Sequence, residues 1–150
     1  MKVAIASDHG GIHIRQELKA LMEEMGIQYE DFGCECDTSV DYPDYALPVA
    51  QKVAAGEFDR GILVCGTGIG MSIAANKVKG IRCALVHDTF SAHATRQHND
   101  TNMLAMGERV IGPGLARDIA KIWLTTEFEG GRHENRVNKI TEFENTNPSL

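Results

Sequence analysis

The part of the sequence best suited to chemistry is a cysteine that opens a glycine-rich turn. An apolar run leads into Cys65, and Gly66, Gly68 and Gly70 follow within five residues. Glycines allow a tight turn that directs several backbone N–H groups into one space. A helix predicted from Ile73 to Val78 would direct its positive end toward the same space. A thiol in this position suits a reaction on a molecule that carries or develops negative charge.

Three familiar glycine-loop motifs do not fit this turn. A dinucleotide-binding fingerprint needs glycine at the sixth position, and a cysteine phosphatase needs arginine six residues after its nucleophile; Met71 occupies both places. A nucleotide-hydrolase loop ends in Gly-Lys-Ser/Thr, but no lysine follows Cys65 before Lys77. The turn taken alone also fits a simpler interpretation, in which Cys65 is a small buried residue at a strand end.

Size and charge limit the class of protein. The chain has 150 residues, so we expect one domain over residues 1–150, with a loose tail from about residue 145. Its net charge is −6. No basic run is present, which argues against nucleic acid as a partner. No apolar stretch reaches membrane-spanning length, and Met1 leads directly into a strand rather than a signal peptide. We therefore expect a cytoplasmic protein that does not bind membranes.

The cysteines and histidines show no metal-binding spacing. Cys34-x-Cys36 is one residue too short for a redox Cys-x-x-Cys pair, and Cys65 and Cys83 fall at predicted strand positions. We expect reduced thiols without a disulfide framework. The six histidines contain no H-E-x-x-H pair or other metal spacing, so the sequence predicts no metal.

Apolar runs alternate with amphipathic stretches along the chain. The predicted strands are Val3–Ala6, Ile27–Phe32, Ile62–Cys65, Ile81–Val86 and Met103–Met106. The predicted helices are Ile12–Met25, one from Asp41 with a kink or break at Pro48, Ile73–Val78, Thr89–His98, one from Pro113 with Leu115, Ile119, Ile122 and Trp123 inward, and Glu134–Phe143. This order predicts an α/β fold, a Rossmann-like three-layer sandwich with a parallel sheet of about five strands and helices on both faces.

Ligands of such sheets bind beyond the carboxyl ends of the strands. Asp8 and His9 follow the first strand as Cys65 follows the third, so we expect all three in one crevice, although Asp8 also fits a helix cap. The polar run 97–102 exceeds what a turn requires, although a loop would contain such residues anyway. Arg109, Arg132 and Arg136 are the candidates for binding an anion. The alternative interpretation is that these arginines are ordinary solvent-exposed surface residues.

Six segments resemble type B ribose-5-phosphate isomerases, in that family's order and from Val3 to about Phe143. They are Ser7-Asp8-His9-Gly10-Gly11, Asp41-Tyr42-Pro43, Cys65-Gly66-Thr67-Gly68-Ile69-Gly70, Ile73-Ala74-Ala75-Asn76-Lys77, Gln97-His98-Asn99-Asp100-Thr101-Asn102 and Gly130-Gly131-Arg132-His133. The resemblance implies interconversion of ribose 5-phosphate and ribulose 5-phosphate through an enediolate, in the non-oxidative pentose phosphate pathway and without metal or cofactor.

The resemblance also implies roles for particular residues. Cys65 would be the base, His98 would open the sugar ring, and Asp8 would bond to the reacting hydroxyls. Thr67 and the turn of Gly66, Gly68, Ile69 and Gly70 would hold the enediolate oxygen. Tyr42 and Asn99 would position the sugar, and His9, Arg109, Arg132 and Arg136 would hold the phosphate.

The family builds this site between subunits, so the resemblance implies a homodimer or a dimer of dimers with a shared site. Two alternatives remain open. The substrate could be allose 6-phosphate or galactose 6-phosphate, on which related isomerases act with the same scaffold. The chain could also be a non-catalytic phosphosugar-binding module, which the presence of Cys65, Thr67 and His98 speaks against.

Overall fold

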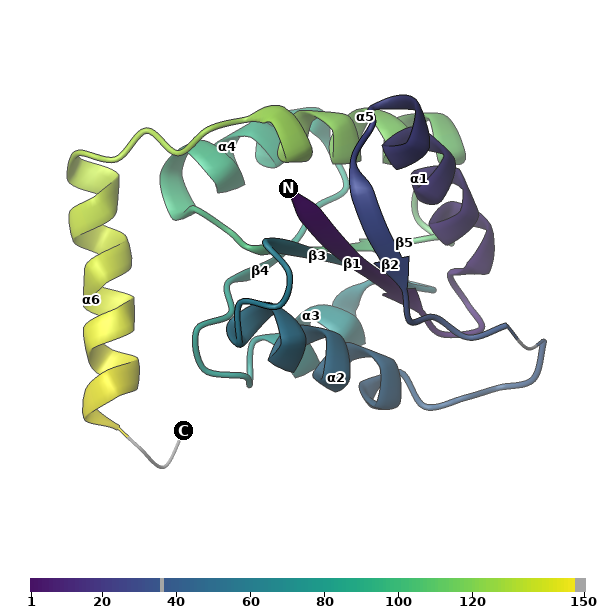
Figure 1. The fold of residues 1–150 in the computed structure, drawn as a ribbon, viewed down its shortest axis with the longest axis horizontal. Coiled ribbons are helices and arrows are strands. Elements are labelled where there is room, and N and C mark those ends of the chain that lie inside the picture. The colour runs from purple at the N-terminus through teal and green to yellow at the C-terminus, as the bar shows by residue number, and fades with distance from the viewer. Residues whose placement is uncertain (36, 148–150) are drawn as a thin grey trace.

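A computed structural model describes residues 1–35 and 37–147. The strands are β1 (Lys2–Ser7), β2 (Gln28–Asp31), β3 (Arg60–Cys65), β4 (Cys83–Leu85) and β5 (Met103–Gly107). The helices are α1 (Ile12–Glu24), α2 (Pro43–Ala54), α3 (Ile69–Ala75), α4 (Thr89–Asn99), α5 (Pro113–Thr125) and α6 (Arg132–Thr146). The strands form one parallel sheet in the order β2-β1-β3-β5-β4 (Figure 1), which confirms the predicted fold class.

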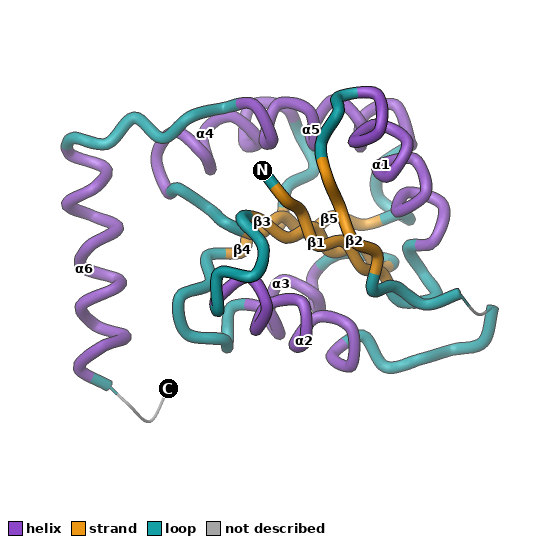
Figure 2. The backbone as a smooth tube through the Cα atoms, in the orientation of Figure 1, coloured by secondary structure: helices purple, strands orange, loops and turns teal. Residues whose placement is uncertain are grey.

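Alternate residues of each central strand face opposite layers of helices. Val3 and Ile5 of β1 belong to a buried cluster with side chains of α1, α4 and α5, whereas Ala4 and Ala6 pack with α2 and α3. Figure 2 shows these two helix layers on either side of the strands. The two-residue period of a strand and the 3.6-residue period of a helix produce this division, because each element buries one apolar face.

The segments that follow β1 and β3 leave the sheet toward opposite faces. These strands are neighbours, yet β1 leads into α1 on one face of the sheet and β3 leads into α3 on the other. The two connecting segments therefore diverge at the carboxyl edge, which is where open parallel sheets generally bind ligands. Asp8 and Cys65 stand at this point, one at the end of each strand.

Two predicted helix limits and one predicted inward-facing residue were wrong. Helix α3 begins at Ile69, directly after Gly68, rather than at Ile73. Leu115 is exposed because the inward stripe of α5 is formed by Ala116, Ile119, Ala120, Trp123 and Leu124. Helix α6 continues to Thr146, past the expected start of the tail at about residue 145, and residues 148–150 lie outside the described part.

The predicted break at Pro48 does not occur, because α2 is one helix from Pro43 to Ala54. Pro48 is exposed, and its ring nitrogen has no hydrogen to donate to the carbonyl of Asp44, four residues earlier. The neighbours Val49, Ala50 and Val53 are buried against the sheet layer. Packing of this apolar face therefore maintains the helix despite the missing hydrogen bond.

Replacing Pro48 with alanine is expected to raise the free energy of unfolding by about 1–2 kcal/mol. The regained helical hydrogen bond stabilises the folded state, while the more flexible unfolded chain offsets part of that gain. Urea denaturation monitored by circular dichroism measures the change. Pro43→Ala is the control, because proline at the first helical position lacks no hydrogen bond and should change stability little. Equal effects of the two substitutions would contradict this account.

A fully buried arginine joins α1 to the end of β1 and to the segment after β2. Arg15 Nη1 donates to Ser7 Oγ at 2.8 Å, and Nη2 donates to Glu35 Oε1 at 2.8 Å. Arg15 Nε lies 3.4 Å from Asp31 Oδ1. A Cβ on Gly33 would lie 1.7 Å from Nη1, so only glycine fits beside the guanidinium. This network fixes the residue before Asp8 relative to the segment that leads to α2.

Cys34 is buried and disulfide-bonded. This corrects the expectation that all thiols are reduced. Cys36 lies outside the described residues. Within the described part of the chain, no helix is both long and apolar enough to cross a lipid bilayer.

Candidate active site

Cys65 is the last residue of β3 and begins the turn into α3. Its Sγ accepts the backbone N–H of Gly68 at 3.0 Å, so the turn folds back onto the sulfur. Gly68 has a φ of +74°, a left-handed conformation that glycine adopts at little cost. The N–H of Ile69 donates to Thr67 Oγ1 at 3.3 Å. The turn therefore presents the thiol and the Thr67 hydroxyl together with the first turn of α3.

The segment after β1 lies directly against this turn. Asp8 N–H donates to the carbonyl of Val64 at 3.3 Å, and Asp8 Oδ1 accepts the N–H of Gly10 at 2.8 Å. A Cβ on Gly10 would lie 3.0 Å from the backbone nitrogen of Gly66. The two segments approach closely because glycines stand at the contact. Asp8 and Cys65 therefore stand at adjacent strand ends, as the shared-crevice prediction requires.

His9 and Tyr42 connect this edge to the segment between β2 and α2. His9 Nδ1 accepts the N–H of Val40 at 3.2 Å, which leaves Nε2 as the imidazole nitrogen able to face a ligand. The ring of Tyr42 lies against the start of α3, since a Cβ on Gly70 would meet it at 2.7 Å. Tyr42 is 39 % exposed, so part of the residue is accessible to a bound molecule.

Arg109 completes this group from the turn after β5. Its backbone N–H donates to the carbonyl of Gly66 at 3.0 Å, and the N–H of Glu108 donates to the carbonyl of Cys65 at 2.9 Å. The Arg109 side chain lies over Gly66, where an added Cβ would be 3.4 Å from its Nε. A fixed cation beside the thiol turn suits an anionic ligand.

Replacing Gly107 with alanine is expected to lower kcat at least about tenfold, because a shift of about 1 Å in reacting groups has effects of this size or larger. The new Cβ would lie 2.6 Å from the backbone carbon of Thr67, so the turn that carries the thiol must move. Steady-state kinetics measures the effect. Gly112→Ala is the matched control, because nothing lies within 4 Å of an added Cβ there. Unchanged kcat in Gly107→Ala would refute a tight geometric requirement at the turn.

Part of the polar run 97–102 is structural. Asp100 accepts from Arg96 Nη1 at 2.8 Å, and Thr101 Oγ1 accepts the indole N–H of Trp123 at 2.9 Å. These bonds hold the junction of α4 and β5, as the loop interpretation anticipated. His98 and Asn99, at the end of α4, remain as candidates for contact with a ligand.

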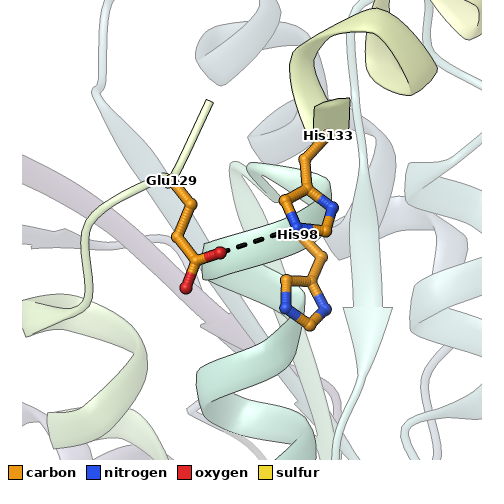
Figure 3. A group of neighbouring side chains, drawn as sticks. All are labelled: His98, Glu129 and His133. Atoms are coloured by element: carbon orange, nitrogen blue, oxygen red, sulfur yellow. Dashed lines mark ion pairs between the residues drawn. The ribbon is translucent and has the colours of Figure 1, made fainter. Parts of the chain in front are cut away.

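A second group of candidate residues gathers around His98. The rings of His98 and His133 are stacked with centroids 4.3 Å apart, and Glu129 Oε2 lies 3.5 Å from His133 Nε2 (Figure 3). Arg132 and Arg136 stand on the first turns of α6 beside them. Burial lowers the pKa of His133, electrostatic interaction with His98, Arg132 and Arg136 lowers it further, and Glu129 opposes these effects. His133 belongs to one of the segments that resemble the isomerase family, but no role was predicted for it.

The two groups stand at opposite edges of the sheet. In β5, Gly107 is paired with Cys65, whereas Met103 is paired with Gly61 at the other end of β3. Asn99 precedes Met103 by only four residues, so the end of α4 belongs to the amino edge. The length of β5 alone separates the edges by roughly 13 Å. One chain therefore brings together Asp8, His9, Tyr42, the turn 65–70 and Arg109, but not His98, Asn99, Arg132 and Arg136.

The chain is a parallel sheet between two layers of helices, with a thiol, a carboxylate and a guanidinium at the carboxyl edge of the sheet. This arrangement is typical of an α/β enzyme. The chain belongs to the Ribose/Galactose Isomerase family, whose model matches residues 3–140, and it is an isomerase.

Individual relatives agree with this assignment. The chain is 76% identical over 148 residues to the Bacillus subtilis protein YwlF, itself assigned only provisionally as a sugar phosphate isomerase, with 98% of this chain and 99% of the relative covered. It is 49% identical over 143 residues to ribose-5-phosphate isomerase B of Escherichia coli (95% and 96% covered). It is 41% identical over 145 residues to the D-erythrulose-4-phosphate isomerase of Pectobacterium atrosepticum (96% and 95% covered). Among solved structures, ribose-5-phosphate isomerase B of Clostridium thermocellum superimposes with a TM-score of 0.94 at 52% identity, covering 97% of this chain and 99% of that one.

Proposed function

We propose that this isomerase interconverts ribose 5-phosphate and ribulose 5-phosphate through an enediolate, with Cys65 as the base. The observation that carries the proposal is the placement of the Cys65 sulfur at the carboxyl edge, where it accepts the Gly68 N–H at 3.0 Å. A directed N–H donor stabilises negative charge on the sulfur. The similarity to enzymes named ribose-5-phosphate isomerase B supports the pentose phosphate as substrate and the non-oxidative pentose phosphate pathway as context.

In the proposed reaction, the Cys65 thiolate removes the proton from C2 of the open-chain aldose. The electron pair of that C–H bond forms the C1–C2 double bond, and the carbonyl oxygen at C1 takes the negative charge. The amides of the turn and the Thr67 hydroxyl stabilise this oxygen. A proton moves from the C2 hydroxyl to the C1 oxygen, while Asp8 is hydrogen-bonded to both oxygens. The thiol then returns its proton to C1. The product is the ketose, and no electron leaves the substrate.

The remaining candidates act on the rest of the sugar. His98 opens the furanose ring by proton transfer, and Tyr42 and Asn99 hold the sugar hydroxyls. His9 and Arg109 bind the phosphate from the edge that carries Cys65. Arg132 and Arg136 bind it from the group around His98, because guanidinium groups suit bidentate contacts with phosphate.

We propose that the active site is completed by a second subunit, in a homodimer or a dimer of dimers. The two groups stand at opposite edges within one chain, which supports a site assembled from two chains. Helix α6 stands beside the body of the molecule in Figure 1, and its Ile140 and Phe143 are 52% and 59% exposed. Exposed apolar side chains on a projecting helix suit burial against a partner.

Subunit mixing tests this arrangement. Cys65→Ala and His98→Ala proteins are expected to be inactive separately and to recover about a quarter of wild-type activity after equal mixing and exchange. Half of the dimers would then contain both chains, and each of these would have one intact site. Subunit exchange is verified by native mass spectrometry with one chain isotopically labelled. Verified exchange without recovered activity would refute a shared site.

The substrate proposal is tested by comparing sugars in the presence of a metal chelator. We expect kcat/KM to be highest for ribose 5-phosphate, by at least about tenfold over allose 6-phosphate, galactose 6-phosphate and D-erythrulose 4-phosphate. A higher value for one of the others would reassign the substrate while keeping the chemistry. Tight phosphosugar binding without exchange of the C2 proton into deuterated solvent would instead identify a binding module.

A further inference from the structure

Three side chains of types that can ligate transition metals lie close together where the end of α4 meets the start of α6. His98, Glu129 and His133 each have a ligand atom within 4.8 Å of the other two, and they form the one such group among the described residues. Figure 3 shows the two stacked imidazole rings one above the other, with the Glu129 carboxylate directed toward His133. The three residues come from α4, from the segment before α6 and from α6 itself.

Backbone contacts hold these three segments in place. The N–H of Glu129 donates to the carbonyl of Gln97 at 3.1 Å, which attaches the segment before α6 to the last turn of α4. Gly130 and Gly131 follow with φ values of +66° and +57°, and the chain turns there directly into α6. The His133 side chain is 8% exposed and that of Glu129 is 50% exposed, which leaves an approach from solvent on the carboxylate side.

The donor set selects the kind of ion. Two imidazole nitrogens and one carboxylate oxygen suit Zn²⁺, with a fourth position left for water. Mg²⁺ and Ca²⁺ require oxygen ligands, whereas two of the three ligand residues here are histidines, so the site favours an ion with strong bonds to imidazole. The rings are stacked with planes 15° apart, so their in-plane lone pairs run side by side. A bound ion therefore requires rotation of at least one ring.

We propose that His98, Glu129 and His133 form an inhibitory Zn²⁺ site. An ion bonded to His98 occupies a nitrogen whose proton transfer opens the sugar ring, so zinc and catalysis compete for one side chain. The inhibitory effect rests on the proposed function, whereas the binding site rests on the proximity of the three ligand side chains. Chelation releases the histidine, so the inhibition is reversible.

Binding is tested with Co²⁺, whose visible absorption reports ligand type and geometry. The wild-type protein is expected to bind one Co²⁺ per chain with nitrogen and oxygen ligands, and Zn²⁺ is expected to displace it. Glu129→Gln and His133→Gln should each weaken binding at least about tenfold. Glu127→Gln, an exposed glutamate two residues away, is the matched control and should bind as the wild type does. Cys65→Ala should also bind normally, because the site contains no thiol.

Inhibition is measured separately with the isomerase assay. Zn²⁺ is expected to abolish wild-type turnover until chelator is added, and Glu129→Gln should need at least about tenfold more Zn²⁺ for the same inhibition. Absence of Co²⁺ binding, or binding with a sulfur-to-cobalt charge-transfer band that disappears in Cys65→Ala, would overturn the site. Specific Co²⁺ binding by a protein that turns over no sugar would support the site and refute the proposed function.

Discussion

Replacing Cys65 with alanine is expected to lower kcat for ribose 5-phosphate by at least about 1,000-fold, within the range lost when a catalytic acid or base is removed. The proposed mechanism uses this sulfur twice, to take the proton from C2 and to deliver it to C1. The substituted turn lacks the sulfur that accepts the Gly68 N–H, but it keeps the glycines and the contact with Gly10. Binding of the phosphosugar should therefore persist, measured by calorimetry.

Cys83→Ala provides the matched control for this experiment. Cys83 is the other free cysteine among the described residues, and burial raises the pKa of its thiol to about 12. It is therefore a neutral thiol at neutral pH and should contribute nothing to proton transfer. We expect kcat within about twofold of wild type after its removal, as for most substitutions away from a site. Turnover above a tenth of wild type in Cys65→Ala, with C2 proton exchange retained, would remove Cys65 as the base.

Replacing Arg15 with methionine is expected to lower the free energy of unfolding by about 3 kcal/mol, the lower end of the range for breaking a buried ion pair. The guanidinium has no solvent exposure, and its removal takes hydrogen bonds from Ser7 and Glu35 and a charge from Asp31. Asp31 keeps its 2.8 Å contact with Lys19, and Glu35 is exposed, so the loss does not reach the upper end. Urea denaturation measures the change.

Lys19→Met is the control from the same helix and toward the same carboxylate. The Lys19 ammonium pairs with Asp31 but remains partly exposed, so we expect a loss below about 1 kcal/mol. Arg15→Lys should fall between the two, because an ammonium keeps the charge but cannot reach the three partners as a planar fork. Equal stability of Arg15→Met and wild type would mean that the aliphatic part of the side chain provides its whole contribution.

The sheet could be predicted because its signal is local. Each strand is an apolar run between turn residues, and the helix after β1 has one apolar stripe ending at Gly26. The boundaries of α3 were not predictable from the glycines alone, since the sequence does not say which of them takes the left-handed conformation. Gly68 alone among the turn glycines does so, and the helix begins immediately after it. Helix α2 likewise passes through Pro48 because of tertiary packing.

Some contacts among the site residues could likewise be predicted from the sequence, and others could not. Asp8 and Cys65 were expected together because both stand at the carboxyl ends of parallel strands, which required only the fold class; the structure makes the two strands neighbours. The buried network of Arg15 was missed, because an arginine on a helix reads as a solvated residue. The approach of His98 to His133 was also missed, because it depends on how the chain turns into α6 at Gly130 and Gly131. No sequence spacing encodes a contact between two such distant segments.

The opposite placement of the Cys65 and His98 groups has a kinetic consequence. If each active site takes one group from each of two chains, an isolated chain carries two incomplete halves. The initial rate would then rise linearly with enzyme concentration when chains are associated and approach second order as dilution separates them. Specific activity would fall on dilution without any chain unfolding, and a saturating phosphosugar that bridges both groups would shift that transition to lower protein concentration.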